Sequence, residues 1–458
     1  MRVLMAIPPS RLVYSSVGPD LGLLYAVRAL KNAGHAVRVV DGLLDPSLDL
    51  VREIDAFGAD AVGIKSFSKD MVASGALLAR VKEARPHVLT LVGGPHTSGE
   101  PVGTLDHFPG IDYVFRGESE VGLPKLLTVL DEDPAPPPEV LAGIEGLGWR
   151  KEGRGVANCA HYPADLDALG LPAWEDMPPD RYPRDYNNKP VVPVITTRGC
   201  PYSCTYCAGH LNTGKKLRHH SMDYLVEMLR NLWTTYRVPY FSIWDDNFTL
   251  HQRFAREFCE AYLRSGLPMT WGCPNGVRID TLDRELLVLM ERAGCRVLRV
   301  AVEAGTQHIM DHMKRELDME EIRDKLRLVK ECTRMEVHGF FIIGYPEETR
   351  SDVLATLRFS RELPLDQAAF FLYTPHPGTL YWDRVAHDEI TGLTTFDYDR
   401  PSIPLADVDL EGLKALQRKA YLGFYLRPRI LTRNAAVLLN PTNLPTLARR
   451  VWSAAVGS

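Results

Sequence analysis

The first 130 residues alternate between short apolar runs and amphipathic stretches. The apolar runs are five to eight residues long and rich in Val, Leu and Ile, which predicts buried strands; the stretches between them repeat apolar residues at helical spacing. The predicted strands are residues 2–9, 36–41, 61–68, 88–95 and 113–117, and the predicted helices are 21–34, 70–85 and a stretch ending near 131. Five repeats of strand and helix predict a doubly wound parallel sheet of Rossmann-like or flavodoxin-like size.

Small and polar residues gather where these strands end. Ligands of doubly wound sheets bind at the carboxyl ends of the strands, and glycine there lets a ligand approach the backbone closely. No Gly-x-Gly-x-x-Gly follows the first strand and no phosphate loop is present, so a dinucleotide is disfavoured. The candidate binding residues at the strand ends are Pro8, Ser66, Ser68, Gly93, Gly94, His96, Gly117 and Glu118.

The alternation resumes at residue 191 and runs through six strand–helix units. Predicted strands are 191–197, 240–245, 269–274, 297–303, 339–345 and 368–374, and predicted helices are 221–236, 251–265, 283–293, 318–335 and 350–362. Polar residues again cluster at the carboxyl ends of these strands, which is where βα barrels carry their chemistry.

The segments between and after these patterns divide the chain. Residues 131–138 are acidic and proline-rich, which predicts a stiff boundary, and 140–189 hold many Pro, Gly and Asp residues. Beyond residue 384 we expect a small helical region with an amphipathic helix near 410–426. The predicted division is therefore 1–133, a linker or connector at 134–189, 190–384, and a helical C-terminal region at 385–458.

Composition narrows the function classes. The chain has 458 residues and a formal net charge of −5, which argues against a nucleic-acid partner. No apolar run reaches the ~18 residues of a membrane-spanning helix, and the N-terminus predicts a strand rather than a signal peptide. Five cysteines are scattered, which is typical of core thiols in a reducing cytoplasm rather than of disulfides.

The three other cysteines form the densest chemical motif of the chain. Cys200, Cys204 and Cys207 are spaced by three and then two residues, just after the strand predicted at 191–197. Thiolates this close fit an iron–sulfur cluster; a cubane has four irons, so one iron stays open for a non-protein ligand. The alternatives are a zinc site, with His210 or His219 as fourth ligand, or three buried thiols.

The Cys-x3-Cys-x2-Cys spacing after a first strand, with the aromatic Tyr206 before the third cysteine, resembles the radical S-adenosylmethionine (SAM) superfamily. The six strand–helix units match the partial (β/α)6 TIM-like barrel of that superfamily. The resemblance implies a 4Fe-4S cluster whose open iron binds SAM and whose electron cleaves SAM to a 5′-deoxyadenosyl radical. It also implies an external electron donor such as flavodoxin or ferredoxin.

The same resemblance implies a SAM site. Glu303 matches the position that binds the SAM ribose, and a carboxylate can accept two hydrogen bonds from vicinal hydroxyls. Asp245 lies where the family often has an acidic group near the SAM amino group, and Arg278 is a candidate partner of the SAM carboxylate. The alternative to a SAM contact is a hydrogen-bonded core carboxylate for Asp245 and a surface salt bridge for Arg278. The fifth-strand motif matches at Ile343 and Gly344, whose backbone cradles adenine in the family.

The N-terminal third resembles the cobalamin-binding domain of cobalamin-dependent radical SAM enzymes. Four segments, at 19–25, 62–68, 92–96 and 116–120, match in order and spacing. The Asp-x-His-x-x-Gly motif that supplies a histidine to cobalt is absent, so cobalamin is expected to bind without one, and His96 is expected to be a polar loop residue. A purely structural flavodoxin-like domain is the alternative. A methylthiotransferase is excluded, because it would carry three further cysteines in this domain and none precedes Cys159.

Together these features resemble class B radical SAM methyltransferases. The resemblance implies methylation of an unactivated carbon of a small-molecule, natural-product biosynthetic substrate, through a 5′-deoxyadenosyl radical and methylcobalamin. One alternative keeps the cofactors but performs a rearrangement, cyclisation or ring contraction. The other is a non-catalytic redox or sensor protein that binds the cofactors. No side chain is assigned to catalysis from the sequence.

Overall fold

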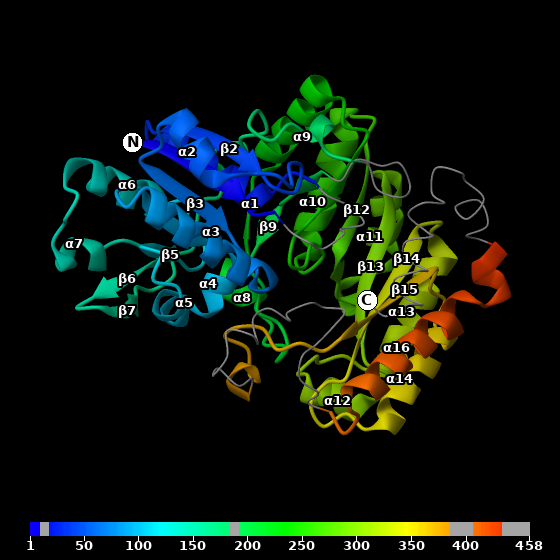
Figure 1. Ribbon diagram of the computed structural model, residues 1–458. Coiled ribbons are helices and arrows are strands. Elements are labelled where there is room, and N and C mark those ends of the chain that lie inside the picture. Colours follow the sequence, from blue (N-terminus) through cyan, green and yellow to red (C-terminus); the bar gives the residue numbers. More distant parts are fainter. Residues whose placement is uncertain (10–17, 184–191, 385–405, 433–458) are drawn as a thin grey trace.

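The computed structural model describes residues 1–9, 18–183, 192–384 and 406–432. Two sheets lie side by side, a mostly parallel one built from the N-terminal third and a parallel one from the region that carries the cysteine motif (Figure 1). A single cluster of buried apolar side chains includes residues from both sheets and extends from Val3 to Ile430. The two halves therefore share one core, and the sites described below lie on a continuous scaffold.

The N-terminal sheet has the expected doubly wound form. Strands β1 to β5 pair in parallel in the order β2-β1-β3-β4-β5, a flavodoxin-like order with its switch point between β1 and β3. Their bounds are β1 Arg2–Ile7, β2 Ala36–Asp41, β3 Ala61–Lys65, β4 Leu89–Gly93 and β5 Tyr113–Phe115. The helices are α1 Leu21–Asn32, α2 Leu50–Phe57, α3 Met71–Ala84, α4 Pro95–Gly99, α5 Pro101–His107 and α6 Gly122–Glu132.

The sheet continues into the segment that the sequence assigns to a linker. After α7 (Pro138–Ala142), strands β6 (Leu147–Lys151) and β7 (Arg154–Ala157) form an antiparallel hairpin, and β6 pairs antiparallel with β5. Leu147 and Trp149 are buried. The hairpin is too short, and too rich in glycine and charge, to show in the hydrophobic pattern. The other segment boundaries stay predictions.

The second sheet has six parallel strands in the order β15-β14-β13-β12-β11-β8, which confirms the partial barrel. The strands are β8 Pro193–Val194, β11 Tyr240–Ile243, β12 Thr270–Val277, β13 Cys295–Glu303, β14 Glu336–Ile343 and β15 Gln367–Leu372. The helices between them are α9 Met222–Tyr236, α10 Gln252–Ser265, α11 Arg284–Arg292, α12 Gln307–His312, α13 Met319–Cys332 and α14 Arg350–Glu362. The first strand is short because the chain leaves the sheet after Val194 and forms β9 (Thr197–Arg198), which pairs with β10 (Arg218–His219).

The described part of the C-terminal region is helical, as expected. Helix α16 (Leu410–Tyr425) lies along β15 and α14 (Figure 1). The Tyr425 hydroxyl donates to the Ala368 carbonyl (2.9 Å) and accepts from its N–H (3.2 Å), and Gln417 donates to the Phe370 carbonyl (2.8 Å). These side chains satisfy the outer edge of β15, which would otherwise be free to pair with another strand.

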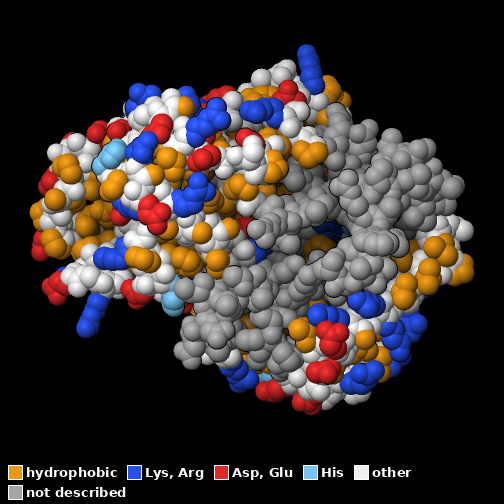
Figure 2. All heavy atoms as spheres, viewed as in Figure 1, with side chains coloured by type: hydrophobic (Ala, Val, Ile, Leu, Met, Phe, Trp, Pro, Cys, Tyr) orange, Lys and Arg blue, Asp and Glu red, His pale blue; other side chains and the backbone are white. Residues whose placement is uncertain are grey.

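The surface in Figure 2 fits the acidic composition. Among the side chains coloured by type, Lys and Arg are interspersed with Asp and Glu, and this face has no continuous basic area of the kind that nucleic acids require. Nor is any described helix both long enough and apolar enough to cross a membrane.

Candidate active site

The conformation of the cysteine loop is fixed by a glycine at its start and by hydrogen bonds to neighbouring residues. Gly199 has a φ of +100°, and a Cβ there would lie 2.3 Å from the Lys216 carbonyl oxygen, so only glycine fits where the returning chain crosses. The Cys200 N–H donates to the Gly214 carbonyl at 3.1 Å. The Cys207 sulfur accepts from the Gly209 N–H at 3.3 Å. The loop thus carries its thiols on a fixed backbone.

The three thiols are close enough to affect one another. Burial, with a smaller contribution from the charges of Asp246, Cys204 and Cys200, raises the pKa of Cys207 to about 12, although the Gly209 N–H lowers it. Burial also raises the pKa of Cys200. A bound cation would reverse this, because it stabilises thiolates, and the Gly209 N–H is the kind of donor that supports cluster sulfur. The donor set therefore fits an iron–sulfur cluster.

The zinc alternative finds less support. In the described residues, no three or more His, Cys, Asp or Glu side chains converge on the position of one metal ion. A closed zinc site needs such convergence, whereas a cubane spreads its ligands over different irons. His219, one candidate for the fourth zinc ligand, packs its ring 4.9 Å from that of Phe254.

A cavity of about 330 Å³ opens at the carboxyl ends of β12 to β15. Glu303 ends β13 with a φ of +71°, a strained conformation for a non-glycine residue, and its carboxylate accepts from the Tyr206 hydroxyl at 3.0 Å. Burial raises the pKa of Glu303, and the charge of Arg315 lowers it. The structure therefore brings Tyr206 of the cysteine motif and the predicted ribose ligand Glu303 together in one cavity.

Arg315 is a site residue that the sequence did not single out. Its guanidinium donates to the Ala301 carbonyl at 2.9 Å and to the Cys204 sulfur at 3.9 Å, and it is buried. Arg315 thus places a fixed positive charge beside a candidate cluster ligand. Lys314 and Arg315 are adjacent cations in the sequence, and only the fold shows that Lys314 is exposed while Arg315 turns inward.

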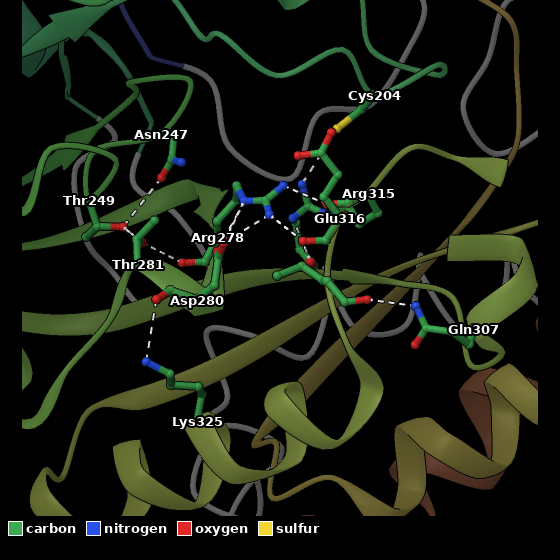
Figure 3. Close-up of polar contacts among 12 residues, drawn as sticks. Cys204, Asn247, Thr249, Arg278, Asp280, Thr281, Gln307, Arg315, Glu316 and Lys325 are labelled. Carbon is green, nitrogen blue, oxygen red and sulfur yellow. Dashed lines mark hydrogen bonds and ion pairs between the residues drawn. The ribbon is translucent and has the colours of Figure 1, made fainter. Parts of the chain in front are cut away.

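Arg278 does not face the cavity, which corrects the sequence-based expectation. Figure 3 shows its guanidinium between Asp280 and the turn at Arg315 and Glu316. It donates to the Asp280 carboxylate (2.9 Å) and to the carbonyls of Arg315 (2.7 Å) and Glu316 (3.0 Å). It also lies 3.8 Å from the centre of the Tyr202 ring. Protein groups occupy its donors, so Arg278 braces the loops around the cysteines.

We expect Arg278→Met to lower the free energy of unfolding by about 2–4 kcal/mol, because it leaves the buried Arg315 carbonyl and the part-buried Glu316 carbonyl without their donor and removes the partner of Asp280. Urea unfolding measures the change. Arg253→Met, at a side chain that is 83% exposed, is the control and should change little. A stable Arg278→Met protein that has lost SAM binding would return Arg278 to the SAM site.

Asp245 is also corrected. Its carboxylate accepts from the N–H groups of Thr196 (2.7 Å) and Thr197 (3.0 Å) and from both threonine hydroxyls (2.5 and 2.9 Å). Burial, partly offset by these hydrogen bonds, raises the pKa of Asp245 to about 6. The residue is the satisfied core carboxylate of the alternative interpretation, and it anchors the segment that leads into the cysteine loop.

At β14, the fifth barrel strand, the residues that line the barrel cavity are neighbours of the predicted Ile343 rather than Ile343 itself. Side chains alternate along a strand, so Phe340 and Ile342 line the cavity while Ile343 is buried elsewhere. The Gly344 N–H donates to Glu348 at 2.6 Å. The backbone contact with adenine at Ile343 and Gly344 stays a prediction.

A second cavity, of about 590 Å³, lies between the two domains at the carboxyl ends of the N-terminal strands. A Cβ on Gly94 would lie 2.8 Å from the Ser66 carbonyl oxygen, so this turn requires glycine. Five of the predicted residues line the cavity, and the barrel closes its other side; the lining includes Pro8, Gly93, Gly94, Gly117, Glu118, Ile195, Arg198, Thr213 and Trp244.

Three predicted contacts lie behind this cavity rather than in it. Ser66 hydrogen-bonds Ser74 (3.1 Å between hydroxyls), and Ser68 hydrogen-bonds Nδ1 of His96 at 3.0 Å. His96 is 1% exposed, and burial lowers its pKa to about 4, so it is neutral. These residues shape the loops that carry the glycines. No histidine is among the described residues that line the cavity.

Family models match both halves of the chain. Residues 11–127 match the B12 binding domain, and residues 194–360 match the radical SAM superfamily. The fold is similar to that of the radical SAM methyltransferase TsrM from Kitasatospora setae, solved with cobalamin and a 4Fe-4S cluster. That similarity has a TM-score of 0.68 at 19% identity and covers 84% of this chain and 78% of the other.

Two curated relatives extend the comparison. An anaerobic magnesium-protoporphyrin IX monomethyl ester cyclase of Rubrivivax gelatinosus is 28% identical over 78% of this chain and 65% of its own. An uncharacterized methyltransferase of Pyrococcus horikoshii is 30% identical over 95% of this chain and 94% of its own. Because the second similarity spans nearly the whole of both proteins and both domain models match, this chain belongs to the family of cobalamin-dependent radical SAM methyltransferases.

Proposed function

We propose that this enzyme methylates an unactivated carbon of a small molecule in natural-product biosynthesis. The observation that carries the proposal is the adjacency of its two cavities. Trp244 lines the interdomain cavity, and Asn275 lines the barrel cavity. The two residues are in contact, because the side chain of Asn275 donates to the Trp244 carbonyl at 2.8 Å. A methyl carrier and a radical source held so near to each other turn two encounters into one.

Each residue set has a role in this proposal. Cys200, Cys204 and Cys207 hold the cluster, while Glu303 and Tyr206 position the SAM ribose. When bound, the cluster and SAM supply a 5′-deoxyadenosyl radical, and cobalamin carries the methyl group. The glycine turns admit the corrin ring, and the closed domain interface excludes water from the reacting groups.

The surroundings of the reaction complete the proposal. An external donor such as flavodoxin or ferredoxin supplies the electron, and the reducing cytoplasm is the compartment. None of the eight cysteines, all of which are among the described residues, forms a disulfide, which fits a reducing compartment. The solved TsrM methyltransferase binds tryptophan as substrate, which supports a small molecule here.

A second candidate function keeps the cofactors without methylation. The similarity to the magnesium-protoporphyrin cyclase favours it, because that relative carries the name of a ring-forming enzyme. Anaerobic turnover of candidate small molecules with methyl-deuterated SAM separates the two. A product that gains one deuterated methyl group supports methylation, whereas a rearranged or cyclised product without the label contradicts it.

We expect Glu303→Gln to weaken SAM binding by about 1–3 kcal/mol, because it replaces a charge-assisted hydrogen bond with a neutral one and keeps the shape. Calorimetric titration of the reconstituted protein with SAM measures the loss. Glu285→Gln, at a side chain that is 89% exposed, is the matched control. A folded Glu303→Gln protein with wild-type SAM affinity would remove Glu303 from the site.

A further inference from the structure

Four charged side chains form a buried cluster where the two domains meet. We call Glu118, Glu120, Arg198 and Arg218 the interface ion cluster. Arg218 pairs with both oxygens of Glu118 (2.5 and 2.8 Å), and Arg198 pairs with Glu120 (2.8 Å) and Glu118 (3.3 Å). The four side chains are only 4–6% exposed. The glutamates come from the loop after β5 and the arginines from β9 and β10, so every pair joins the two domains.

The cluster is balanced and geometrically restricted. Two positive and two negative charges cancel, which is the condition for burying ions without a large cost. Arg198 also lies 4.7 Å from the centre of the Tyr25 ring of α1. Arg218 donates to the carbonyls of Pro163 (2.8 Å) and Thr213 (2.6 Å). Directional contacts of this kind fix orientation, whereas apolar packing alone would tolerate sliding.

The place of the cluster connects it to both cofactor sites. Arg198 is two residues before Cys200, and it lines the interdomain cavity together with Glu118 and Glu120. Arg198 and Arg218 also face each other across the β9–β10 pair, which carries the start of the cysteine loop. One side of the cluster is therefore cavity wall, and the other is the base of the loop.

We propose that the interface ion cluster is a positioning device that holds the cobalamin cavity and the cysteine loop at one fixed separation. The inference rests on the proposed function, since it assigns cobalamin to the interdomain cavity and the 4Fe-4S cluster to the loop. A methyl carrier and a radical source must address the same substrate carbon, and an error of about 1 Å in such positioning costs about a hundredfold in rate.

Two conservative variants and one control test the proposal. Glu120→Gln keeps the volume and leaves Arg198 its contact with Glu118, and Arg198→Lys keeps the charge but loses the planar fork. Glu175→Gln is the control, because Glu175 pairs with Arg28 of α1 at 2.8 Å but lies at an exposed position. Each full-length protein is reconstituted with iron and sulfide and titrated with hydroxocobalamin. Pulsed electron paramagnetic resonance then measures the separation between cob(II)alamin and the reduced cluster.

In the wild type and the control we expect one narrow cobalt-to-cluster distance. In Glu120→Gln and Arg198→Lys we expect full iron content, loss of the single distance, and hydroxocobalamin binding about tenfold weaker. A wild-type distance distribution in both variants overturns the proposal. A wild type that binds no hydroxocobalamin instead overturns the proposed function itself. If Glu120→Gln loses its iron, Arg198→Lys decides the outcome by the same two measurements.

Discussion

Replacing Cys200, Cys204 and Cys207 together with Ala removes the brown chromophore and about four irons per chain, the content of one cubane. The reason is local: these three thiols share one loop, and the remaining cysteines lie elsewhere in the described structure, buried in the core or isolated. Iron and sulfide analysis after anaerobic reconstitution, with the visible spectrum, measures the loss.

The control and the contrary results are equally specific. Cys159→Ala combined with Cys332→Ala removes two thiols outside the loop and should leave the iron content unchanged. Iron retained by the triple variant would place the cluster elsewhere. A colourless wild type that binds one zinc would instead support the alternative with His210 or His219 as fourth ligand.

The hydrophobic pattern predicts both folds because long parallel strands are apolar on both faces. The mostly apolar runs at 61–68 and 297–303, for example, locate the ends of β3 and β13 to within a few residues. The hydrophobic pattern does not predict the β6–β7 hairpin. The two buried apolar residues of β6, Leu147 and Trp149, alternate over too short a span to distinguish a strand from a loop.

Site residues are predictable where the chain itself brings them together. Cys200, Cys204, Tyr206 and Cys207 lie within eight consecutive residues, so their spacing alone predicts the cluster site. Arg278 and Asp245 carry the right charge at the right strand ends. Besides Asp280, however, Arg278 donates to the remote carbonyls of Arg315 and Glu316, and Asp245 accepts from the remote Thr196 and Thr197. Sequence alone gives the charge of a side chain and not the distant groups that already hydrogen-bond to it.

The ion pairs of the interface ion cluster are likewise not predictable from the sequence. Glu118 is predicted as a cobalamin contact because it follows a strand end. The structure adds that its carboxylate is shared by Arg198 and Arg218, which are 80 and 100 residues away in the chain (198 − 118 and 218 − 118). Only the packing of the two domains turns a strand-end glutamate into a link between them.

Cob(II)alamin bound to this protein should show no histidine nitrogen on cobalt. The Asp-x-His-x-x-Gly motif is absent, and the described residues that line the interdomain cavity include no histidine. His96, the histidine at the strand ends, is buried behind the cavity and hydrogen-bonded to Ser68. Lys65, which does line the cavity, is paired with Asp20 at 2.7 Å. The lower face of cobalt is therefore left to water, a non-histidine group or nothing.

Electron paramagnetic resonance of the cob(II)alamin form measures this directly. Uniform ¹⁵N labelling of the protein should leave the hyperfine pattern of cobalt unchanged, because any nitrogen on cobalt would then belong to cobalamin itself. His96→Ala should give the same spectrum as the wild type. A splitting that changes with ¹⁵N labelling and disappears in His96→Ala would contradict the prediction, since it would place an imidazole on cobalt. Failure of the anaerobic wild type to retain cobalamin would contradict the assignment of the interdomain cavity, and with it the methyltransferase proposal.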